Sequence, residues 1–210
     1  MAALIQGAQR VVYPAGAVVP DWEEVPWAAF VLRGSVRVFL PSHQGAQITL
    51  RYLRPGDMIG TFTGIRTGLA RSLQALDSSE LLHLDVARIS ELARREPPLA
   101  WEMLLETARV LRLAHRAYGI RAFGSIRVRV ANAILDLALA RGRVAAGTVV
   151  SGTQHELANA AGTVREVVAS TLQALKRDGI IDVRRGGIVI LDPDRLAREA
   201  DGGFGFGLPD

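Results

Sequence analysis

The sequence contains no cysteine among its 210 residues. It can therefore form no disulfide framework, no thiolate zinc site and no Cys-ligated iron–sulfur cluster, and it offers no cysteine nucleophile. Long hydrophobic runs are missing too. No stretch reaches the roughly 18 consecutive apolar residues that a membrane-spanning helix needs. The first residues also hold no apolar run of signal-peptide length. We therefore expect a protein without a membrane segment, located in the reducing cytoplasm.

Lysine is nearly missing as well, because Lys176 is the only lysine among 25 basic residues. The net charge is only +4, but residues 109–185 carry thirteen basic and five acidic side chains, whereas residues 1–96 carry ten and nine. A polyanion would therefore bind the second half of the chain. Charge alone fits equally well with arginines that merely form a solvated helix face.

Hydrophobic residues make up 49% of the chain, and charged residues 22%. With a mean hydropathy of +0.19, the chain can bury a sizeable core, which excludes disordered, collagen-like and purely coiled-coil proteins. A length of 210 residues fits two modest domains.

Short strands are predicted from residue 11 to about residue 84. This region contains period-two stretches such as 35–39, and turn signals recur at close intervals, among them 33–34 and 55–57. Closely spaced turns favour antiparallel strands that fold into a roll or barrel. We predict an all-β domain over residues 1–96, which ends in a helix.

A long helix is predicted over residues 97–124, and Pro97-Pro98 is well placed to open it. Along it, side chains repeat at alternating spacings of four and three residues, as in a helix seam: Leu104, Ala108, Leu111, His115, Tyr118 and Ala122. Such a seam can pack on the chain's own β domain or against the same helix of a second copy. The second arrangement suits a connecting helix better, so we expect a homodimer.

Two T-x-x-E sequences follow a further predicted helix at residues 126–141. Residues 153–156 and residues 163–166 each have the spacing of a capping box, which begins a short helix. The small residues 158 and 160–162 between them permit two helices to cross closely. This arrangement predicts a helix-turn-helix.

A hairpin is predicted after the second of these helices. Asp178-Gly179 forms a turn into it, and Arg184 and Arg185 lie at its tip, as in the wing of a winged helix. We assign residues 125–195 to this winged domain, residues 97–124 to a dimerisation helix and hinge, and residues 196–210 to a flexible glycine-rich tail.

The order of these parts resembles the cyclic-AMP receptor protein/FNR (CRP/FNR) superfamily of bacterial transcription regulators over about residues 11–192. The stretches that carry the resemblance are YPAG (13–16), VLRGSVRVF (31–39), LRPGDMIG (53–60), ARS (70–72), ELLHLD (80–85) and TQHELANAAGTVREVVASTLQALKRDGII (153–181). The resemblance implies an α+β fold: a cyclic-nucleotide-binding-like β-roll (double-stranded β-helix), a long dimerisation helix and a C-terminal winged helix-turn-helix. It also implies a homodimer that binds double-stranded DNA and contacts RNA polymerase. The protein is therefore expected to be a transcription regulator, and specifically an activator.

Three residues of the second capped helix are expected to read bases. Arg165 can donate to guanine O6 and N7 together, and the family carries an Arg-Glu pair at the positions of Arg165 and Glu166. Glu166 can accept from cytosine N4 or close the capping box on Thr163. Ser170 stands where many members carry a base-reading arginine, so the recognised sequence is expected to differ.

Phosphate contacts are expected where a helix begins and where the wing ends. The residues placed for them are Thr153, Gln154, Thr163, Arg184 and Arg185. For Thr153 the alternative is helix capping alone, and for the two wing arginines it is a solvated hairpin.

The resemblance also places an effector pocket at Gly60, Thr61, Arg71, Ser72, Ala114 and His115. In members that bind cyclic nucleotides, a glutamate anchors the ribose where this chain has Thr61, and a hydroxyl pair reaches the base where it has Ala114 and His115. These departures count against cyclic AMP, because each lost polar contact costs about 1–3 kcal/mol.

Other effectors stay open. Another small ligand, or none, is compatible with the sequence, and haem needs only one or two axial ligands, for which His43, His83 and His115 are available. Histidines inside a strand or a helix seam are more often structural. GxGxxG, P-loop, HExxH and G-x-S-x-G motifs are lacking, so we predict no enzyme and no metal site.

Overall fold

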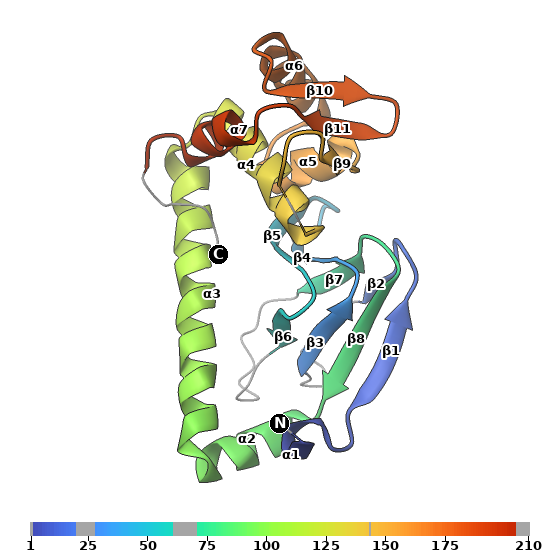
Figure 1. The fold of residues 1–210 in the computed structure, drawn as a ribbon, viewed down its shortest axis with the longest axis vertical. Coiled ribbons are helices and arrows are strands. Elements are labelled where there is room, and N and C mark those ends of the chain that lie inside the picture. Colours follow the sequence, from blue (N-terminus) through green and yellow to red (C-terminus); the bar gives the residue numbers. More distant parts are fainter. Residues whose placement is uncertain (1, 20–27, 61–70, 143, 205–210) are drawn as a thin grey trace. The chain divides into compact units, whose positions relative to one another are not determined.

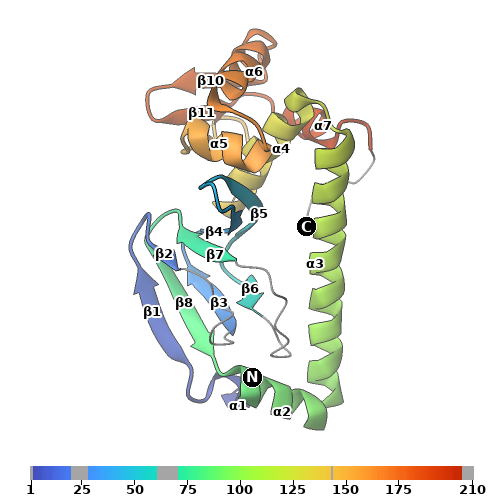
Figure 2. The same ribbon diagram turned by 180° about the vertical axis from the view of Figure 1, so that it is seen from behind.

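The computed structural model describes residues 2–19, 28–60, 71–142 and 144–204. The chain divides into two compact units: residues 1–45 with 51–112, and residues 46–50 with 113–210. The first unit holds most of the strands, and the second is built from helices with a small sheet (Figures 1 and 2).

Two four-stranded sheets make up the β-roll. One has the order β1 (Gln9–Tyr13), β8 (Ser79–Leu84), β3 (Ala28–Arg33) and β6 (Met58–Gly60), and the other the order β2 (Val18–Val19), β7 (Ser72–Ala75), β4 (Val36–Pro41) and β5 (Gln47–Leu53). Neighbours in the first sheet are antiparallel, as are the pairs that β7 makes with β2 and β4. The roll predicted from the turn signals is therefore confirmed.

The core of the roll lies between the two sheets, because each buries one face of apolar side chains. Alternate residues such as Val36 and Val38 on β4 join Leu73 on β7 and Leu81 on β8 in one buried cluster. Arg37 is also buried, with its guanidinium 4.6 Å from the centre of the Phe39 ring. A cation over an aromatic face reduces the cost of taking this charge out of water.

Three helices belong wholly or in part to the first unit: α1 (Ala2–Ile5), α2 (Val86–Arg95) and the start of α3 (Pro97–Phe123). Asp85 caps α2 by accepting hydrogen bonds from the amides of Ala87 and Arg88. The long helix predicted at residues 97–124 is thus present, with a proline at its first position. Within the described ranges, no helix combines the length and the apolar character needed to cross a bilayer.

The second unit is a winged helix-turn-helix. It comprises α4 (Ile126–Ala140), β9 (Val149–Val150), α5 (Gln154–Ala161), α6 (Arg165–Arg177), β10 (Ile181–Arg184), β11 (Gly187–Ile190) and α7 (Pro193–Asp201). The three strands form one sheet of order β10-β11-β9. Helix α4 is its scaffold: eight of its residues are buried, and it packs against α5, α6 and α7.

Helix α7 corrects the predicted boundary at residue 195. Residues 196–201, which the sequence analysis assigned to a flexible tail, continue a helix that Pro193 begins and Asp192 caps by accepting from the amide of Arg195. Leu196 and Ala200 are fully buried on α4, so the helix is part of the core. Residues 205–210 lie outside the described residues.

Two glycines in left-handed turns give a prediction about the roll. Gly34 has a φ of +78°, and a Cβ there would lie 2.5 Å from Ser79 Oγ and 2.6 Å from Asp77 Oδ1. Gly45 has nearly the same φ, +81°, but a Cβ there would meet nothing within 4 Å. We expect Gly45→Ala to lower the free energy of unfolding by about 1 kcal/mol through backbone strain alone. Gly34→Ala should cost about 3 kcal/mol, because overpacking is added.

The measurement is urea unfolding of both variants against the parent chain. Equal losses at Gly34 and Gly45 would show that the packing around Asp77 and Ser79 does not hold the β3–β4 turn.

Candidate nucleic-acid interface

Helix α5 begins with the first predicted capping box. Thr153 Oγ1 accepts from the Glu156 amide at 3.1 Å, and the Thr153 amide donates to Glu156 Oε2 at 2.6 Å. This prediction is confirmed, and it means that the Thr153 hydroxyl serves the helix end. A phosphate contact by Thr153 stays a prediction.

The second predicted capping box, on Thr163, is wrong. Helix α6 begins at Arg165, its N-cap residue is Val164, and no side chain caps it. The cause lies in the preceding turn: Gly162 is left-handed, at φ 62°, and the Thr163 amide donates to Ala158 O at 3.0 Å. This is the closing bond of a Schellman motif, so Thr163 completes the end of α5 and cannot begin α6.

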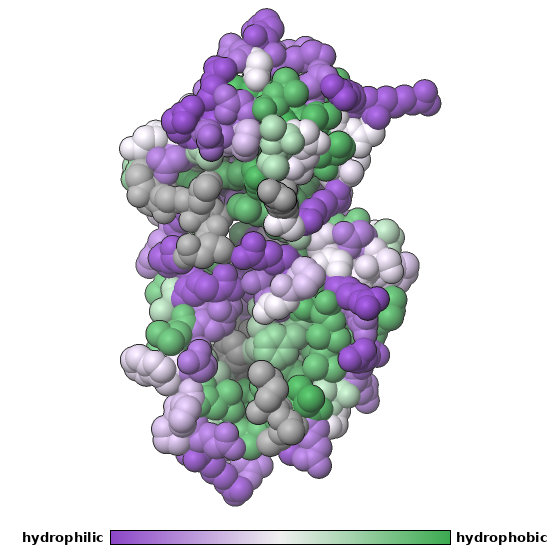
Figure 3. Space-filling view, in the orientation of Figure 1, coloured by the Kyte–Doolittle hydropathy of each residue, from purple (hydrophilic) through white to green (hydrophobic). Residues whose placement is uncertain are grey.

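Helix α6 buries one face and exposes the other. Val168, Leu172 and Leu175 are at most 2% exposed, whereas Arg165, Glu166 and Ser170 are exposed. The three predicted base-reading residues therefore share the open face of one helix. Figure 3 shows hydrophilic residues over α6 and at the tip of the β10–β11 hairpin.

The same exposed face contains Gln173, which the sequence analysis missed. Its position could have been found from the helical repeat, since it lies three residues after Ser170 and one turn before Arg177.

Gln154 links the two helices of the motif. Its side-chain Oε1 lies 3.3 Å from Arg165 Nε, so it accepts from the base-reading candidate although the two residues begin different helices. The bond leaves the terminal nitrogens of Arg165 available for a partner. Gln154 was expected to meet a phosphate. The bond to Arg165 occupies its side-chain oxygen and leaves its NH2 group available, so the phosphate contact stays a prediction.

A groove of about 490 Å³ runs between the start of α5 and the β10–β11 hairpin. Its lining includes Thr153 and Gln154 on one side and Arg184 and Gly186 on the other. Arg141, which follows α4, also lines it and was not singled out from the sequence. The lining thus combines polar and cationic side chains with apolar ones such as Leu157 and Ile188.

The two wing arginines differ. Arg184 Nε donates to Asp182 Oδ2 at 2.8 Å, and Lys176 contacts the other oxygen of Asp182 at 2.8 Å. These two cations hold the pKa of Asp182 at about 2, below its ordinary value. Arg184 is therefore partly neutralised and oriented, whereas Arg185 is exposed at the tip of the hairpin.

Arg127 anchors the far end of α6. From the first turn of α4 it donates to both carboxylate oxygens of Glu199 at 2.8 Å, and it pairs with Asp178, the C-cap residue of α6, at 2.7 Å. These hydrogen bonds raise the pKa of Arg127 and lower that of Glu199. One guanidinium thus joins α4, α6 and α7, a role that the sequence analysis did not foresee because its partners lie 51 and 72 residues away.

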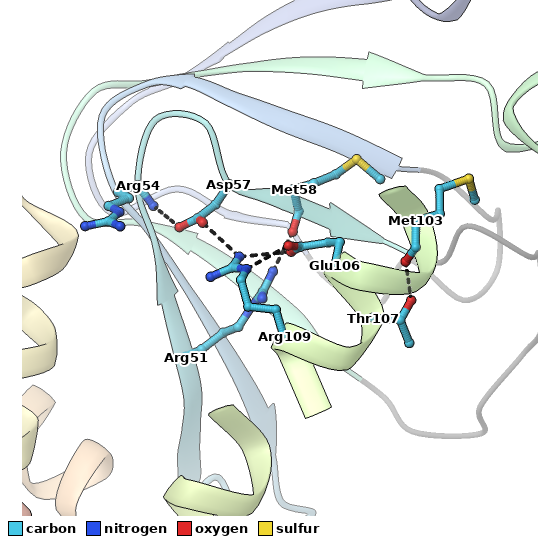
Figure 4. A network of polar contacts seen from close by, with 8 residues as sticks. All are labelled: Arg51, Arg54, Asp57, Met58, Met103, Glu106, Thr107 and Arg109. Atoms are coloured by element: carbon cyan, nitrogen blue, oxygen red, sulfur yellow. Dashed lines mark hydrogen bonds and ion pairs between the residues drawn. The ribbon is translucent and has the colours of Figure 1, made fainter. Parts of the chain in front are cut away.

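A polar network joins the roll to the middle of α3 within the first unit (Figure 4). Asp57 accepts from the Arg54 amide at 2.9 Å and from Arg109 at 3.1 Å, and Arg109 binds Glu106 through two nitrogens at 2.7 and 2.9 Å. Arg51 donates to the Met58 carbonyl, and its burial lowers its pKa. The turn in LRPGDMIG is therefore fixed to the long helix by ion pairs.

The predicted effector residues are only partly described. Gly60 ends β6 opposite Ala28, and Ser72 is buried at the start of β7, directly after Arg71. Thr61 lies outside the described residues, and Ala114 and His115 are exposed on α3. The assembly of a pocket from these six positions stays a prediction.

Of the candidate haem ligands, His83 is the most enclosed. Its Nε2 lies 3.0 Å from the Tyr13 hydroxyl, and burial lowers its pKa. That hydrogen bond gives His83 a structural role between β1 and β8. His43 and His115 are exposed, and a ligand role for any of the three stays a prediction.

Comparison with known proteins agrees with this geometry. Residues 128–199 match the model of the Crp-like helix-turn-helix domain, and residues 10–96 match that of the cyclic nucleotide-binding domain. A protein named cyclic AMP receptor protein from Thermus thermophilus is 32% identical over 196 residues, which cover 92% of this chain and 89% of the relative. The chain belongs to the CRP/FNR family of transcription regulators.

Solved structures of CRP/FNR regulators have the same fold. A transcriptional regulator of the CRP family from Thermus thermophilus has a TM-score of 0.71 at 25% identity, covering 90% of this chain and 96% of that one. A crp/fnr family regulator from Eubacterium rectale has a TM-score of 0.77 at 20% identity, covering 95% and 92%. The winged unit of this CRP/FNR regulator is thus a DNA-binding domain, and the family acts as dimers.

Proposed function

We propose that two copies of this CRP/FNR regulator bind an inverted-repeat operator, each laying α6 into the major groove, and that binding activates transcription. The observation that carries the proposal is the division of α6, which buries Val168, Leu172 and Leu175 and leaves Arg165, Glu166 and Ser170 open to solvent. A two-fold dimer would meet half-sites about one DNA turn apart.

Arg165 reads guanine through its terminal nitrogens, oriented by Gln154. Glu166 accepts from cytosine N4, and the corrected helix start supports this role, because a glutamate that closes no capping box keeps its carboxylate free. Ser170 carries only a hydroxyl and contributes less discrimination. Thr153, Thr163, Arg184 and Arg185 contact phosphates and set the register of the protein on the duplex.

Two substitutions separate base reading from phosphate binding. Arg165→Ala should lower affinity for the preferred duplex by about 1–3 kcal/mol and remove the preference for one base pair in each half-site. Arg185→Ala should weaken binding to all duplexes alike and reduce the slope of log affinity against log salt by about one.

The measurement is fluorescence anisotropy with duplexes selected from a random library, titrated at several salt concentrations. If Arg165→Ala keeps the full sequence preference, Arg165 does not read a base. If the parent chain shows no salt-sensitive duplex binding under any ligand condition, the winged helix contacts a protein and the proposed function fails.

The homodimer is supported by the exposed seam of α3. Leu104, Leu111 and Tyr118 are 55%, 54% and 74% exposed, and Ala108 and His115 are exposed with them. Large apolar side chains at heptad spacing are rarely left in water, and the same seam of a second copy would cover them. This supports the partner helix over packing on the chain's own roll.

A charge in the seam should separate the two copies. We expect Leu111→Asp to weaken dimerisation by at least about ten-fold, because each copy would bury an unpaired carboxylate. Ile5→Asp changes an apolar residue of similar exposure, 44%, on α1 and should leave the dimer intact. Sedimentation equilibrium, read against the chain mass of 22.6 kDa, checks both. A Leu111→Asp protein that still sediments as a tight dimer would place the dimer interface elsewhere.

The sequence and the family relationship point to different effectors. Ligands vary across the family, with cyclic AMP and haem among them, and the name of the Thermus relative favours cyclic AMP. Thr61 and the Ala114-His115 pair of this chain count against it, because they remove the polar partners expected for ribose and base. We infer that another small ligand, or a preorganised state without a ligand, sets the active arrangement, and that RNA polymerase contact then follows.

Cyclic AMP should therefore leave operator affinity unchanged within about two-fold, since a ligand shifts an equilibrium only by its differential affinity. The measurement is the same anisotropy titration with and without millimolar nucleotide. An increase of ten-fold or more would establish this chain as a cyclic-AMP-dependent regulator with an atypical pocket.

A further inference from the structure

We propose that Val164 is a specificity-determining residue, which contacts the 5-methyl group of a thymine next to the base pair that Arg165 reads. The inference rests on the proposed function, because it requires α6 to lie in the major groove. It assigns a role to a residue that the sequence pattern had included only as a spacer inside a capping box.

Val164 is exposed, in contrast to the three apolar side chains that α6 buries in the core. It is 59% exposed, whereas Val168, Leu172 and Leu175 are buried almost completely. The core of the winged unit therefore gains little from the isopropyl group of Val164. It stands beside Arg165 and Glu166, the two exposed residues with which α6 opens.

Val164 also does not serve the helix end. The residues that begin α2, α4, α5 and α7 each accept a hydrogen bond from a helix amide through their side chains, namely Asp85, Ser125, Thr153 and Asp192. Val164 accepts none. A serine or threonine at an N-cap stabilises a helix by about 1 kcal/mol, so α6 lacks a stabilising contact that α2, α4, α5 and α7 have.

The chemistry of the major groove identifies what an apolar side chain can contact there. Base edges present donors and acceptors, and the 5-methyl group of thymine is the apolar group among them. Phosphates would favour a hydroxyl or a cation at this position. A branched aliphatic side chain at the start of a recognition helix therefore matches thymine, with the neighbouring Arg165 fixing which base pair is within reach.

The test replaces thymine by uracil, which pairs identically but lacks the methyl group. A preferred duplex is selected with the full-length parent chain, and each thymine is then exchanged for uracil at both symmetric positions in turn. At one pair of positions, adjacent to the base pair whose preference Arg165→Ala removes, uracil should lower parent affinity by about four-fold for each half-site. Exchange of thymine for uracil at any other position should change the affinity by less than about two-fold.

The ratio of thymine to uracil affinities is then measured for Val164→Ser. This variant restores a capping hydroxyl and removes both methyl groups, and its ratio should fall to about one whatever its absolute affinity. Val12→Ser changes a valine of similar exposure, 65%, on β1 and should keep the parent ratio.

Two results would overturn the inference while leaving the proposed function intact: equal affinity of the parent chain for thymine and uracil at all positions, or a ratio that survives in Val164→Ser. In either case Val164 is an isolated exposed hydrophobic residue of the kind that protein surfaces tolerate. Failure of the parent chain to select any duplex would instead refute the proposed function, and the inference with it.

Discussion

The left-handed turn at Gly162 is the constraint on which the start of α6, and with it the proposed DNA-binding surface, depends. Once Gly162 turns the chain and the Thr163 amide closes on Ala158, Thr163 belongs to the end of α5 and α6 has to begin one residue later. The starting residue decides which residue is the N-cap and which side chains can cap the helix. It frees the Glu166 carboxylate from capping, and it leaves Val164 at the exposed end.

The architecture was predictable from the sequence, whereas several helix ends were not. The roll, the long helix and the winged helix-turn-helix each have a periodic signal or recurrent turns, and the structure confirms them. A T-x-x-E spacing is more ambiguous, because the same threonine can complete one helix or begin the next. Thr153 follows strand β9, so no helix end competes for it and the capping box forms. Thr163 directly follows α5, and the Schellman turn of α5 takes precedence there.

Contacts distant in sequence account for what the sequence analysis missed. Helix α7 has a clear start at Asp192-Pro193 and a stop at Gly202. The glycine-rich residues after it favoured a flexible tail, which placed the predicted domain boundary at residue 195, inside the helix. Arg127 resembles any other arginine of a basic helix until folding brings Asp178 and Glu199 to it. The exposed polar residues of α6 could be found from the sequence, because a helix that buries every third or fourth residue determines its opposite face as well.

The pairing of Lys176 with Asp182 has a consequence for chemical modification of the protein. Lys176 is the only lysine in the sequence, and it lies in the last turn of α6, where its ammonium binds the same carboxylate as Arg184 of the wing. Acylation can therefore neutralise a side-chain amine at one position alone, the joint between recognition helix and wing. A single acetyl group there would remove the charge that binds one oxygen of Asp182 and leave that carboxylate paired with Arg184 alone.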